Sequence, residues 1–335
     1  MRREHFSFFI PVALLTLAVC TARPLTEEAY RDIAPRAGGR HTCITLIDGS
    51  ILCWGSDQEG ESTPLEGPFL SVDTGFMHTC ALRNDRTVAC WGSNQFGQST
   101  PPADEVFSSV SASRVHTCGI DIDKQIRCWG CGNGGGECSQ GLPPNVIPPA
   151  DYTEVSAGDY HTCGITTGRE LRCWGLKGNG RVDAPEGFYT KLSLGAAHAC
   201  AISTDGLLAC WGCGDGVNAC NDFDFGQATP PPGTFVDIQA GGFNTCGLTT
   251  EGTIECWGCG DGIADCGSQD YGQSIPPEGV FSTVTVGLRH ACGQRENGDI
   301  ECWGWNVFGQ ASPPEDLAPP ESLPPSENGT TTTSL

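Results

Sequence analysis

Cysteine is the residue whose number and spacing in this chain could support the most chemistry. Of the 21 cysteines, fourteen form seven pairs with members ten positions apart: Cys43 with Cys53, Cys80 with Cys90, Cys118 with Cys128, Cys163 with Cys173, Cys200 with Cys210, Cys246 with Cys256 and Cys292 with Cys302. Three shorter pairs are Cys131 with Cys138, Cys213 with Cys220 and Cys259 with Cys266. Zinc ligands are usually separated by about two to four residues, so we predict ten disulfides in place of the zinc alternative.

The segments between the shorter pairs carry acidic side chains and one notable aromatic residue. They read CGNGGGEC at 131–138, CGDGVNAC at 213–220 and CGDGIADC at 259–266. Carboxylates gather in and after the last two: Asp215, Asp222, Asp224, Asp261, Asp265 and Asp270. Several oxygen ligands would suit calcium, but the chain has no EF-hand loop or calcium-binding nonapeptide. We predict solvated acids and no metal or cofactor, with calcium as the alternative, and expect Phe223 at a partner surface with Asp215, Asp222, Asp261 and Asp265.

Histidine recurs at one position, two residues before the first cysteine of a pair. It occurs as His41, His78, His116, His161, His198 and His290, with Asn244 in the remaining unit. A ring of imidazoles could bind metal or move protons. Asparagine replaces a hydrogen-bonding role more readily than a ligand role, so we predict a structural function. No nucleophile elbow or isolated carboxylate pair is present. We predict no catalytic residue, and an enzyme with a site composed from several blades is a minor alternative.

These residues recur because the chain is a repeat. Cys-Trp-Gly occurs seven times, with tryptophans at Trp54, Trp91, Trp129, Trp174, Trp211, Trp257 and Trp303. If Cys43 faces Cys53 in a hairpin, residues 47–49 form a three-residue loop that favours a left-handed glycine at its last position. Gly49, Gly206, Gly252 and Gly298 occupy that position, and Arg86, Lys124 and Arg169 occupy it in the other units.

Alternation along the hairpins indicates how the units pack. Cys80, Leu82 and Val88 share one face, whereas Ala81 and Ala89 lie on the other. A bulky face that packs on the small face of the next unit suits radial stacking. Aromatic-led runs add a strand upstream: 69–72, 107–110, 152–155, 235–238 and 281–284. We predict an all-β, seven-bladed β-propeller with disulfides inside the hairpins. The Cys-Trp-Gly tryptophans, Phe96, Phe225, Tyr271 and Phe308 should be core residues.

The termini and the overall charge suggest an exported protein. Residues 1–22 resemble a signal peptide, cleaved either before Cys20, which would then carry a lipid anchor, or near Ala22. Residues 23–35 form a linker and the start of the first repeat, residues 30–314 the propeller, and residues 315–335 a disordered tail. The net charge of −22 disfavours nucleic acid. We predict a monomer that is secreted or held at the cell surface, touching membrane only through the possible anchor.

The ordered motifs His-x-Cys-x-Leu, Asp-Gly, Cys-Trp-Gly-x-Asn and Gly-Gln-x-x-x-Pro resemble the regulator of chromosome condensation repeat family. Gly97-Gln98, Gly226-Gln227, Gly272-Gln273 and Gly309-Gln310 match the last motif, whereas Gly60-Glu61 and Gly180-Arg181 depart from it. The resemblance implies a seven-bladed propeller. The family's founding activity, nucleotide exchange on a nuclear GTPase, is a minor alternative because it conflicts with export and disulfides. A similar secreted bacterial propeller inhibits β-lactamases.

From these observations we predict a non-enzymatic, extracytoplasmic scaffold that binds an unidentified protein partner through loops on one propeller face. The alternative is a structural or adhesive envelope component that binds glycan or surface material.

Overall fold

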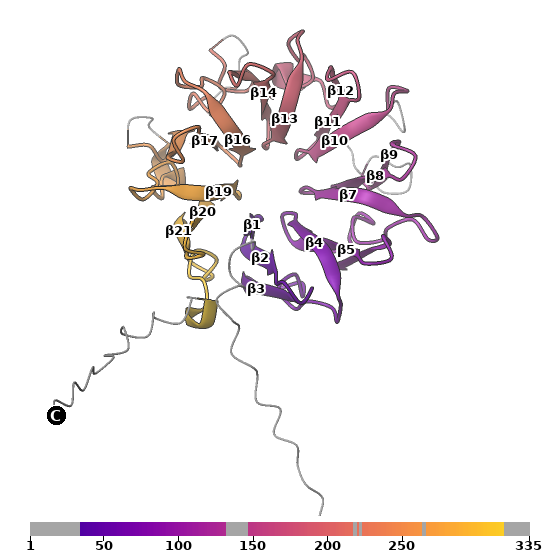
Figure 1. The fold of residues 1–335 in the computed structure, drawn as a ribbon. Helices are drawn as coiled ribbons and strands as arrows, with labels where there is room; N and C mark the ends of the chain where they lie inside the picture. Colours follow the sequence, from indigo (N-terminus) through magenta and orange to yellow (C-terminus); the bar gives the residue numbers. More distant parts are fainter. Residues whose placement is uncertain (1–33, 132–146, 217–219, 221–222, 263–265, 318–335) are drawn as a thin grey trace, which may run out of the picture.

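The computed structural model describes residues 34–131, 147–216, 220, 223–262 and 266–317. Within these residues the chain forms seven three-stranded antiparallel sheets, which stand around a central axis like blades (Figure 1). The prediction of an all-β, seven-bladed propeller is therefore confirmed. The described residues contain no helix that is long and apolar enough to cross a membrane. Tyr30 and residues 1–33 in general, including Cys20, lie outside the described part of the chain.

Each blade contributes an inner, a middle and an outer strand, in that order along the chain. The inner strands are β1 (Arg36–Ala37), β4 (Phe69–Thr74), β7 (Phe107–Ala112), β10 (Tyr152–Ala157), β13 (Tyr189–Leu194), β16 (Phe235–Ala240) and β19 (Phe281–Val286). The middle strands are β2 (His41–Thr45), β5 (His78–Arg83), β8 (His116–Asp121), β11 (His161–Thr166), β14 (His198–Ser203), β17 (Asn244–Thr249) and β20 (His290–Arg295). The outer strands are β3 (Ile51–Gly55), β6 (Val88–Gly92), β9 (Ile126–Gly130), β12 (Leu171–Gly175), β15 (Leu208–Gly212), β18 (Ile254–Gly258) and β21 (Ile300–Gly304).

The paired cysteines lie directly opposite each other on the middle and outer strands. Cys43 faces Cys53 in the β2–β3 ladder, with their Cα atoms 4.1 Å apart, and the same register recurs in the other six hairpins. All seven predicted hairpin disulfides form. Cys213–Cys220 and Cys259–Cys266 are also bonded, whereas Cys138, the expected partner of Cys131, lies outside the described residues.

The hairpin turns have the predicted three-residue form. Leu46 and Ser50 close the first loop through a 2.8 Å hydrogen bond from the Leu46 N–H to the Ser50 carbonyl, and Gly49 has φ of +81°. Arg86, Lys124 and Arg169 adopt the same left-handed conformation with φ of 67°, 63° and 66°. The register therefore imposes this backbone even where the residue is not glycine.

Replacement of Arg169 by glycine should stabilise the protein by about 0.5–1 kcal/mol. The left-handed region costs a side-chain-bearing residue about 1–2 kcal/mol, and part of that gain is offset by the greater freedom of glycine in the unfolded chain. Arg169 is exposed, so little packing is lost. Chemical denaturation would measure the change. Gly206→Ala, at the matching position with φ of +80°, is the reverse control and should destabilise by a similar amount.

Neighbouring blades pack with a bulky face against a small one, as predicted. Leu82 of β5 lies in a buried cluster with Phe107 and Trp129 of the next blade. Ala81, on the opposite face of the same strand, packs in a cluster with Cys43 of the preceding blade. The hairpin disulfides are thus part of the apolar layers between blades. Six of the seven Cys-Trp-Gly tryptophans are buried, and Trp174 is half-buried.

The ring closes between blade 7 and blade 1 without exchange of a strand. The Gln310 carbonyl accepts hydrogen bonds from Trp54 Nε1 at 2.9 Å and from Thr42 Oγ1 at 3.0 Å. Leu317, in the turn η5 (Glu315–Leu317), is 3 % exposed and packs with Ile44 and Trp54. Residues 315–317, assigned to the tail from sequence, therefore form a turn that packs against blade 1 through Leu317.

Candidate functional site

Two loops of every blade meet at one end of the propeller. The first joins the inner strand to the middle strand, and the second follows Cys-Trp-Gly. In blade 1 the Ser56 N–H donates to the Arg40 carbonyl at 2.9 Å and so ties the two loops together. An equivalent bond of 2.8 or 2.9 Å occurs in each of the other six blades. We call this end the loop face; the three-residue hairpin turns lie at the opposite end.

The centre of the loop face is closed in by backbone. Around the channel mouth, the Phe76 N–H donates to the Ser113 carbonyl of the next blade at 3.0 Å, and four equivalent bonds link other neighbours. Glycine permits this approach, because a Cβ atom on Gly75 would lie 2.2 Å from the Ser113 carbonyl oxygen. The space left is about 110 Å³, and its charged lining residues are Arg114 and Asp159.

Around that mouth runs a continuous series of stacked arginine and aromatic side chains. Arg289 lies over Tyr271 and Trp305, at 5.8 and 5.7 Å from the ring centroids, and Trp305 meets Phe308 edge to face at 5.3 Å. Arg40 lies 5.4 Å from the Phe308 and Phe76 rings. Arg114 lies 4.9 Å from Phe76 and pairs with Asp159 at 3.4 Å. We call these side chains the arginine–aromatic arc: Tyr271, Arg289, Trp305, Phe308, Arg40, Phe76, Arg114 and Asp159.

The arc was not foreseen from the sequence. Tyr271 and Phe308 were expected in the core together with Phe96 and Phe225, but Tyr271 is 39 % exposed and the other three are half-buried. They lie on the loop face because the Gly-Gln segment that follows them turns back at the surface. Trp305 is the one tryptophan outside Cys-Trp-Gly. That difference was the sequence signal that could have indicated a surface role for this residue.

The disulfide loops of blades 5 and 6 extend the same face, as predicted. Phe223 is 51 % exposed and stacks on Phe243, with ring centroids 5.5 Å apart and an angle of 12° between the rings. Phe225 meets Phe243 edge to face at 5.8 Å. The structure therefore gathers three aromatic side chains beside the Cys213–Cys220 bridge.

Among the described residues, the carboxylates singled out in those loops do not form a metal-binding group. Asp224 and Asp270 accept hydrogen bonds from the backbone N–H groups of Gly226 and Gly272, two residues ahead. Nowhere in the described chain do three or more His, Cys, Asp or Glu side chains form a group that could hold a metal ion. Asp222 and Asp265 lie outside the described ranges, so the calcium alternative stays a prediction that these residues leave open.

A pocket of about 380 Å³ opens on the loop face between blades 4, 5 and 6. Phe223, Phe243 and Leu176 form the apolar part of its lining. Arg181 and Asp159 are its charged lining residues, and the Cys213–Cys220 bridge also contributes. The pocket combines apolar walls with a few polar groups, the usual composition of a binding site.

Arg181 occupies the position held by glutamine in the Gly-Gln motif. In the matching blades that glutamine fixes the loop: Gln98 Oε1 accepts the Phe96 N–H at 2.9 Å, and Gln227, Gln273 and Gln310 do the same two residues back. A guanidinium has no hydrogen-bond acceptor, so Arg181 cannot make this bond. Arg181 instead donates through Nε to the Gly178 carbonyl at 2.8 Å, and Asn179 between them is left-handed with φ of 61°.

The six histidines have the structural role that we predicted. Five of them hydrogen-bond through Nε2 to a threonine hydroxyl of the next blade at 2.7–2.9 Å: His41 to Thr79, His78 to Thr117, His116 to Thr162, His198 to Thr245 and His290 to Thr42. The Thr117 hydroxyl donates its proton to the Gln98 carbonyl at 3.0 Å, so His78 must be the donor of the bond that they share. These neutral imidazoles link neighbouring blades, and we call each histidine–threonine hydrogen bond a latch.

Two blades depart from this latch, and each departure has a local reason. In the blade that follows His161, Ala199 occupies the position of the threonine. Both ring nitrogens of His161 are buried without a hydrogen-bond partner. Ala291 makes the same change opposite Asn244, which instead donates to the Gln273 carbonyl at 3.4 Å. The asparagine in the sixth unit thus accompanies the loss of the threonine.

Ala199→Thr should stabilise the protein by about 1 kcal/mol. The new hydroxyl would accept from His161 and donate toward the Arg181 carbonyl, which already accepts from Trp211 Nε1 at 3.0 Å; one net hydrogen bond contributes about that much. Urea denaturation would measure the change. Ala199→Val adds the same volume without the hydroxyl, so a gain equal to that of threonine would contradict the hydrogen-bond explanation.

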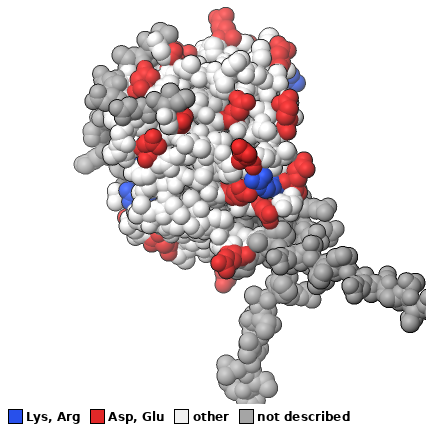
Figure 2. Space-filling model, turned by 90° about the vertical axis from the view of Figure 1, so that its left-hand side faces the viewer, with Lys and Arg blue, Asp and Glu red and all other residues white. Residues whose placement is uncertain are grey.

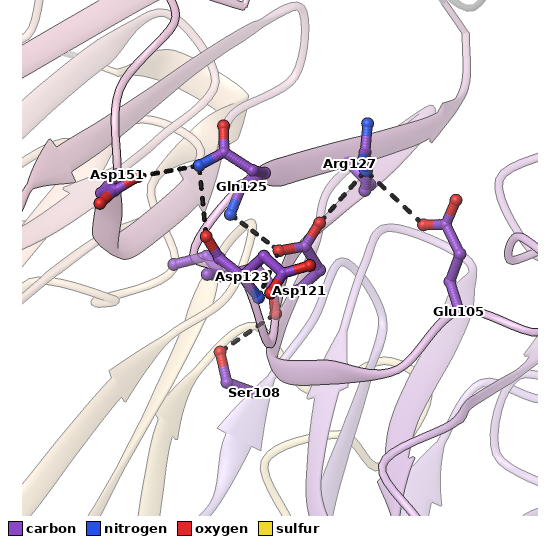
Figure 3. A network of polar contacts seen from close by, with 8 residues as sticks. Glu105, Ser108, Asp121, Asp123, Gln125, Arg127 and Asp151 are labelled. Atoms are coloured by element: carbon purple, nitrogen blue, oxygen red, sulfur yellow. Dashed lines mark hydrogen bonds and ion pairs between the residues drawn. The ribbon is translucent and has the colours of Figure 1, made fainter.

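The hairpin-turn end contains charged residues that bind one another. In Figure 3, Arg127 lies between Asp121 and Glu105, with Nε to oxygen distances of 3.3 and 3.8 Å, and Gln125 donates to Asp151 of the next blade at 3.0 Å. Exposed pairs of this kind contribute little stability. Acidic residues are scattered over the outer side of the ring in Figure 2, with few basic ones among them.

The turn end also has arginine–aromatic pairs, Arg83 with Phe69 and Arg295 with Phe281, and an exposed Phe188. The loop face differs in that its pairs join into one series.

The disulfides indicate an oxidising compartment. Nine bridges are present in the described residues, and such bridges are rare in reducing cytosol. This agrees with the extracytoplasmic location expected from the sequence.

Solved structures similar to this chain include two plant ectodomains. The chain matches the entire ectodomain of the Physcomitrella patens receptor kinase CR4 with a TM-score of 0.64 and 22 % identity, over 81 % of this chain and 73 % of that one. It matches the CRINKLY WD40 ectodomain of the Arabidopsis thaliana receptor kinase ACR4 with a TM-score of 0.63 and 22 % identity, over 81 % and 94 %. The Saccharomyces cerevisiae protein Prp20p, whose structure was described together with its binding to Gsp1p and histones, matches with a TM-score of 0.60 and 14 % identity. The match covers 79 % of this chain and 84 % of that one. These likenesses concern the fold.

At the sequence level, no curated protein matches the chain. The regulator of chromosome condensation (RCC1) repeat family matches at residues 36–61, 69–98, 152–181 and 235–262. Each match covers a blade already identified by its strands and its Cys-Trp-Gly motif. Four of the seven blades therefore match the RCC1 repeat, and disulfides cross-link the hairpins of these blades.

Proposed function

We propose that this protein is a non-enzymatic extracytoplasmic scaffold that binds a protein partner through its loop face. The observation that carries the proposal is the arginine–aromatic arc. The chain has 18 basic against 40 acidic residues, yet Arg40, Arg114 and Arg289 lie together over aromatic rings on this one face.

The composition of the arc supports protein binding. Tryptophan, tyrosine and arginine are the residues most enriched among those that dominate protein–protein binding energy. The rings and the guanidinium groups hold each other in place, so little side-chain entropy remains to be lost when a partner binds. Arg40 and Arg289 each keep a buried Nε without a hydrogen-bond partner. The ectodomain neighbours are extracellular parts of receptors, which supports an extracellular role for this type of propeller.

The proposal is tested by capture of a partner from the protein's own extracytoplasmic fraction. The bait is the oxidised chain without residues 1–22, compared with an Arg289→Ala/Trp305→Ala variant. We expect stoichiometric retention of one soluble protein by the unaltered bait and a loss of at least tenfold with the variant, because about 1.4 kcal/mol is enough for that change and hot-spot residues exceed it.

An Arg172→Ala variant is the matched control, since Arg172 is exposed and pairs with Glu170 toward the turn end. It should retain the partner fully. Equal retention by all three baits would place binding elsewhere on the molecule. If nothing soluble is retained and the baits sediment with envelope fragments, the protein is a structural or adhesive component.

A further inference from the structure

The pocket between blades 4, 5 and 6 contains a buried cation, Arg181, that forms no ion pair among the described residues. Arg181 is 7 % exposed, and burial lowers the pKa of its guanidinium, although the charge of Asp159 in the same pocket opposes part of this effect. Among the described residues no carboxylate lies within ion-pair distance of it, since Asp159, the acid in the same pocket, pairs with Arg114 at 3.4 Å. Buried charges are normally paired. The pocket therefore favours an anionic group from outside.

The apolar part of the pocket adds a second requirement. Phe223 and Phe243 are stacked and present their rings to the pocket beside Leu176 and Ala197. The volume of about 380 Å³ is at the small end of the usual range for ligand pockets. It suits one large side chain with its flanking backbone, and an aromatic ring would pack on the phenylalanines in offset or edge-to-face contact.

Arg181, which departs from the Gly-Gln motif, is also a residue that lines the pocket. Glutamine at this position folds back on its own loop in four other blades, whereas Arg181 lines the pocket. Blade 1 also departs from the motif, with a buried Glu61, but that carboxylate accepts the Glu59 N–H at 2.7 Å and so fixes its loop as glutamine does. Arg181 cannot accept this bond, and its buried charge lines a pocket, which is more readily explained by function than by stability.

We propose that this pocket binds an aromatic residue of the partner together with an adjacent carboxylate, the ring against Phe223 and Phe243 and the carboxylate on the Arg181 guanidinium. The carboxylate comes either from the C-terminus of the partner chain or from a neighbouring acidic residue. The inference rests on the proposed function, because it specifies what part of a protein partner the loop face accepts.

The test uses two small probes that differ only in charge, N-acetylphenylalanine and its amide, titrated against the oxidised protein by ligand-observed NMR. For a probe of this size we expect a Kd on the order of 1 mM for the carboxylate and at least about tenfold weaker binding for the amide. Arg181→Gln installs the residue that four other blades carry, so the loop should still fold. It should weaken carboxylate binding by at least about tenfold and leave the weak amide binding unchanged.

Two further variants complete the design. Phe223→Ala should weaken both probes, because the ring contact is common to them. Arg172→Gln, outside the pocket, should change neither. Equal binding of the two probes, binding unaffected by Arg181→Gln, or no binding of the carboxylate up to about ten times the expected Kd would each overturn the proposal.

The source of the carboxylate is resolved with two blocked peptides, one ending in a free Phe carboxylate and one carrying an internal Phe-Glu with an amidated end. Failure here is distinguishable from failure of the proposed function. If the partner is captured and neither probe binds, the pocket assignment falls and the scaffold function stands. If the probe binds through Arg181 but no protein is captured, the scaffold function falls.

Discussion

Acidification from pH 7.5 to pH 5 should lower the free energy of unfolding by several kcal/mol. Six histidines are buried between blades, and burial lowers the pKa of His41 and His116 to about 4 and that of His78, His198 and His290 to about 3. The pKa of His161 is also lowered by burial. In the unfolded chain these side chains would titrate near the ordinary value of about 6.5.

The direction of this change in stability depends on whether the folded or the unfolded state binds more protons. Between pH 6.5 and about 4 the unfolded histidines are protonated and the folded ones are not, so their contribution is complete above pH 6.5 and is lost as the pH falls. Each costs up to about 1.36 kcal/mol per pH unit, or about 2 kcal/mol at pH 5. Glu154 opposes them, because burial raises its pKa to about 7 and its protonation on acidification favours the folded state. Burial also raises the pKa of Asp73, Asp159 and Asp237, which act in the same direction as Glu154. The six histidines outweigh these four carboxyls, because only Glu154 has a pKa raised to about 7.

Denaturant titrations at pH 7.5, 6 and 5 would measure the loss. His161→Asn is the matched variant, because the sixth blade already pairs Asn244 with Ala291 in the way that His161 faces Ala199. It should be nearly neutral at pH 7.5 and should reduce the acid-dependent loss by about one histidine, or about 2 kcal/mol at pH 5. A pH slope that stays the same in this variant would show that other groups control acid sensitivity.

Removal of one hairpin disulfide by Cys80→Ala/Cys90→Ala should cost about 3–5 kcal/mol. The bridge closes a loop of about eleven residues, worth about 2.8 kcal/mol in the chain-entropy account. Cys80 is fully buried, and Cys90 packs in the cluster of Leu82, Phe107 and Trp129, so lost packing adds to the entropic cost.

Denaturation under oxidising and reducing conditions separates the two contributions. Under oxidising conditions the variant should show the whole loss. When the bridges of both proteins are reduced, the difference between variant and unaltered protein should shrink to the packing part. A difference that is as large under reduction would contradict the entropic account, and a difference near zero under oxidation would show that the neighbouring blades hold the hairpin without its bridge.

Local and repeating features were predictable from sequence because they depend on spacing. The cysteine register fixed the hairpin, and the hairpin fixed the left-handed loop position even at Arg86 and Lys124, which carry no local signal for it. The structural role of the histidines was predictable from Asn244, because asparagine can replace a hydrogen-bonding residue more readily than a metal ligand. Their threonine partners could not be inferred, because those contacts join successive blades.

The loop face was only partly predictable, for the same reason. Phe223 was identified because it follows a disulfide loop within one unit. The arc was missed because its contacts run between units: Arg40 and Phe308 come from opposite ends of the described chain, and no periodic pattern relates them. Arg181 was visible as a departure from the Gly-Gln motif, but its burial beside Phe223 and Phe243 depends on three blades at once.

The way the ring closes has a topological consequence. All strands of blade 1 come from the start of the described chain and all strands of blade 7 from its end, so within the described residues no covalent link joins blade 7 to blade 1. The boundary between them depends on contacts such as those of Gln310 and Leu317. The boundary between blades 7 and 1 is therefore where the two ends could be joined in a circular permutant. It is also the boundary that should separate first if the two ends of the chain are pulled apart.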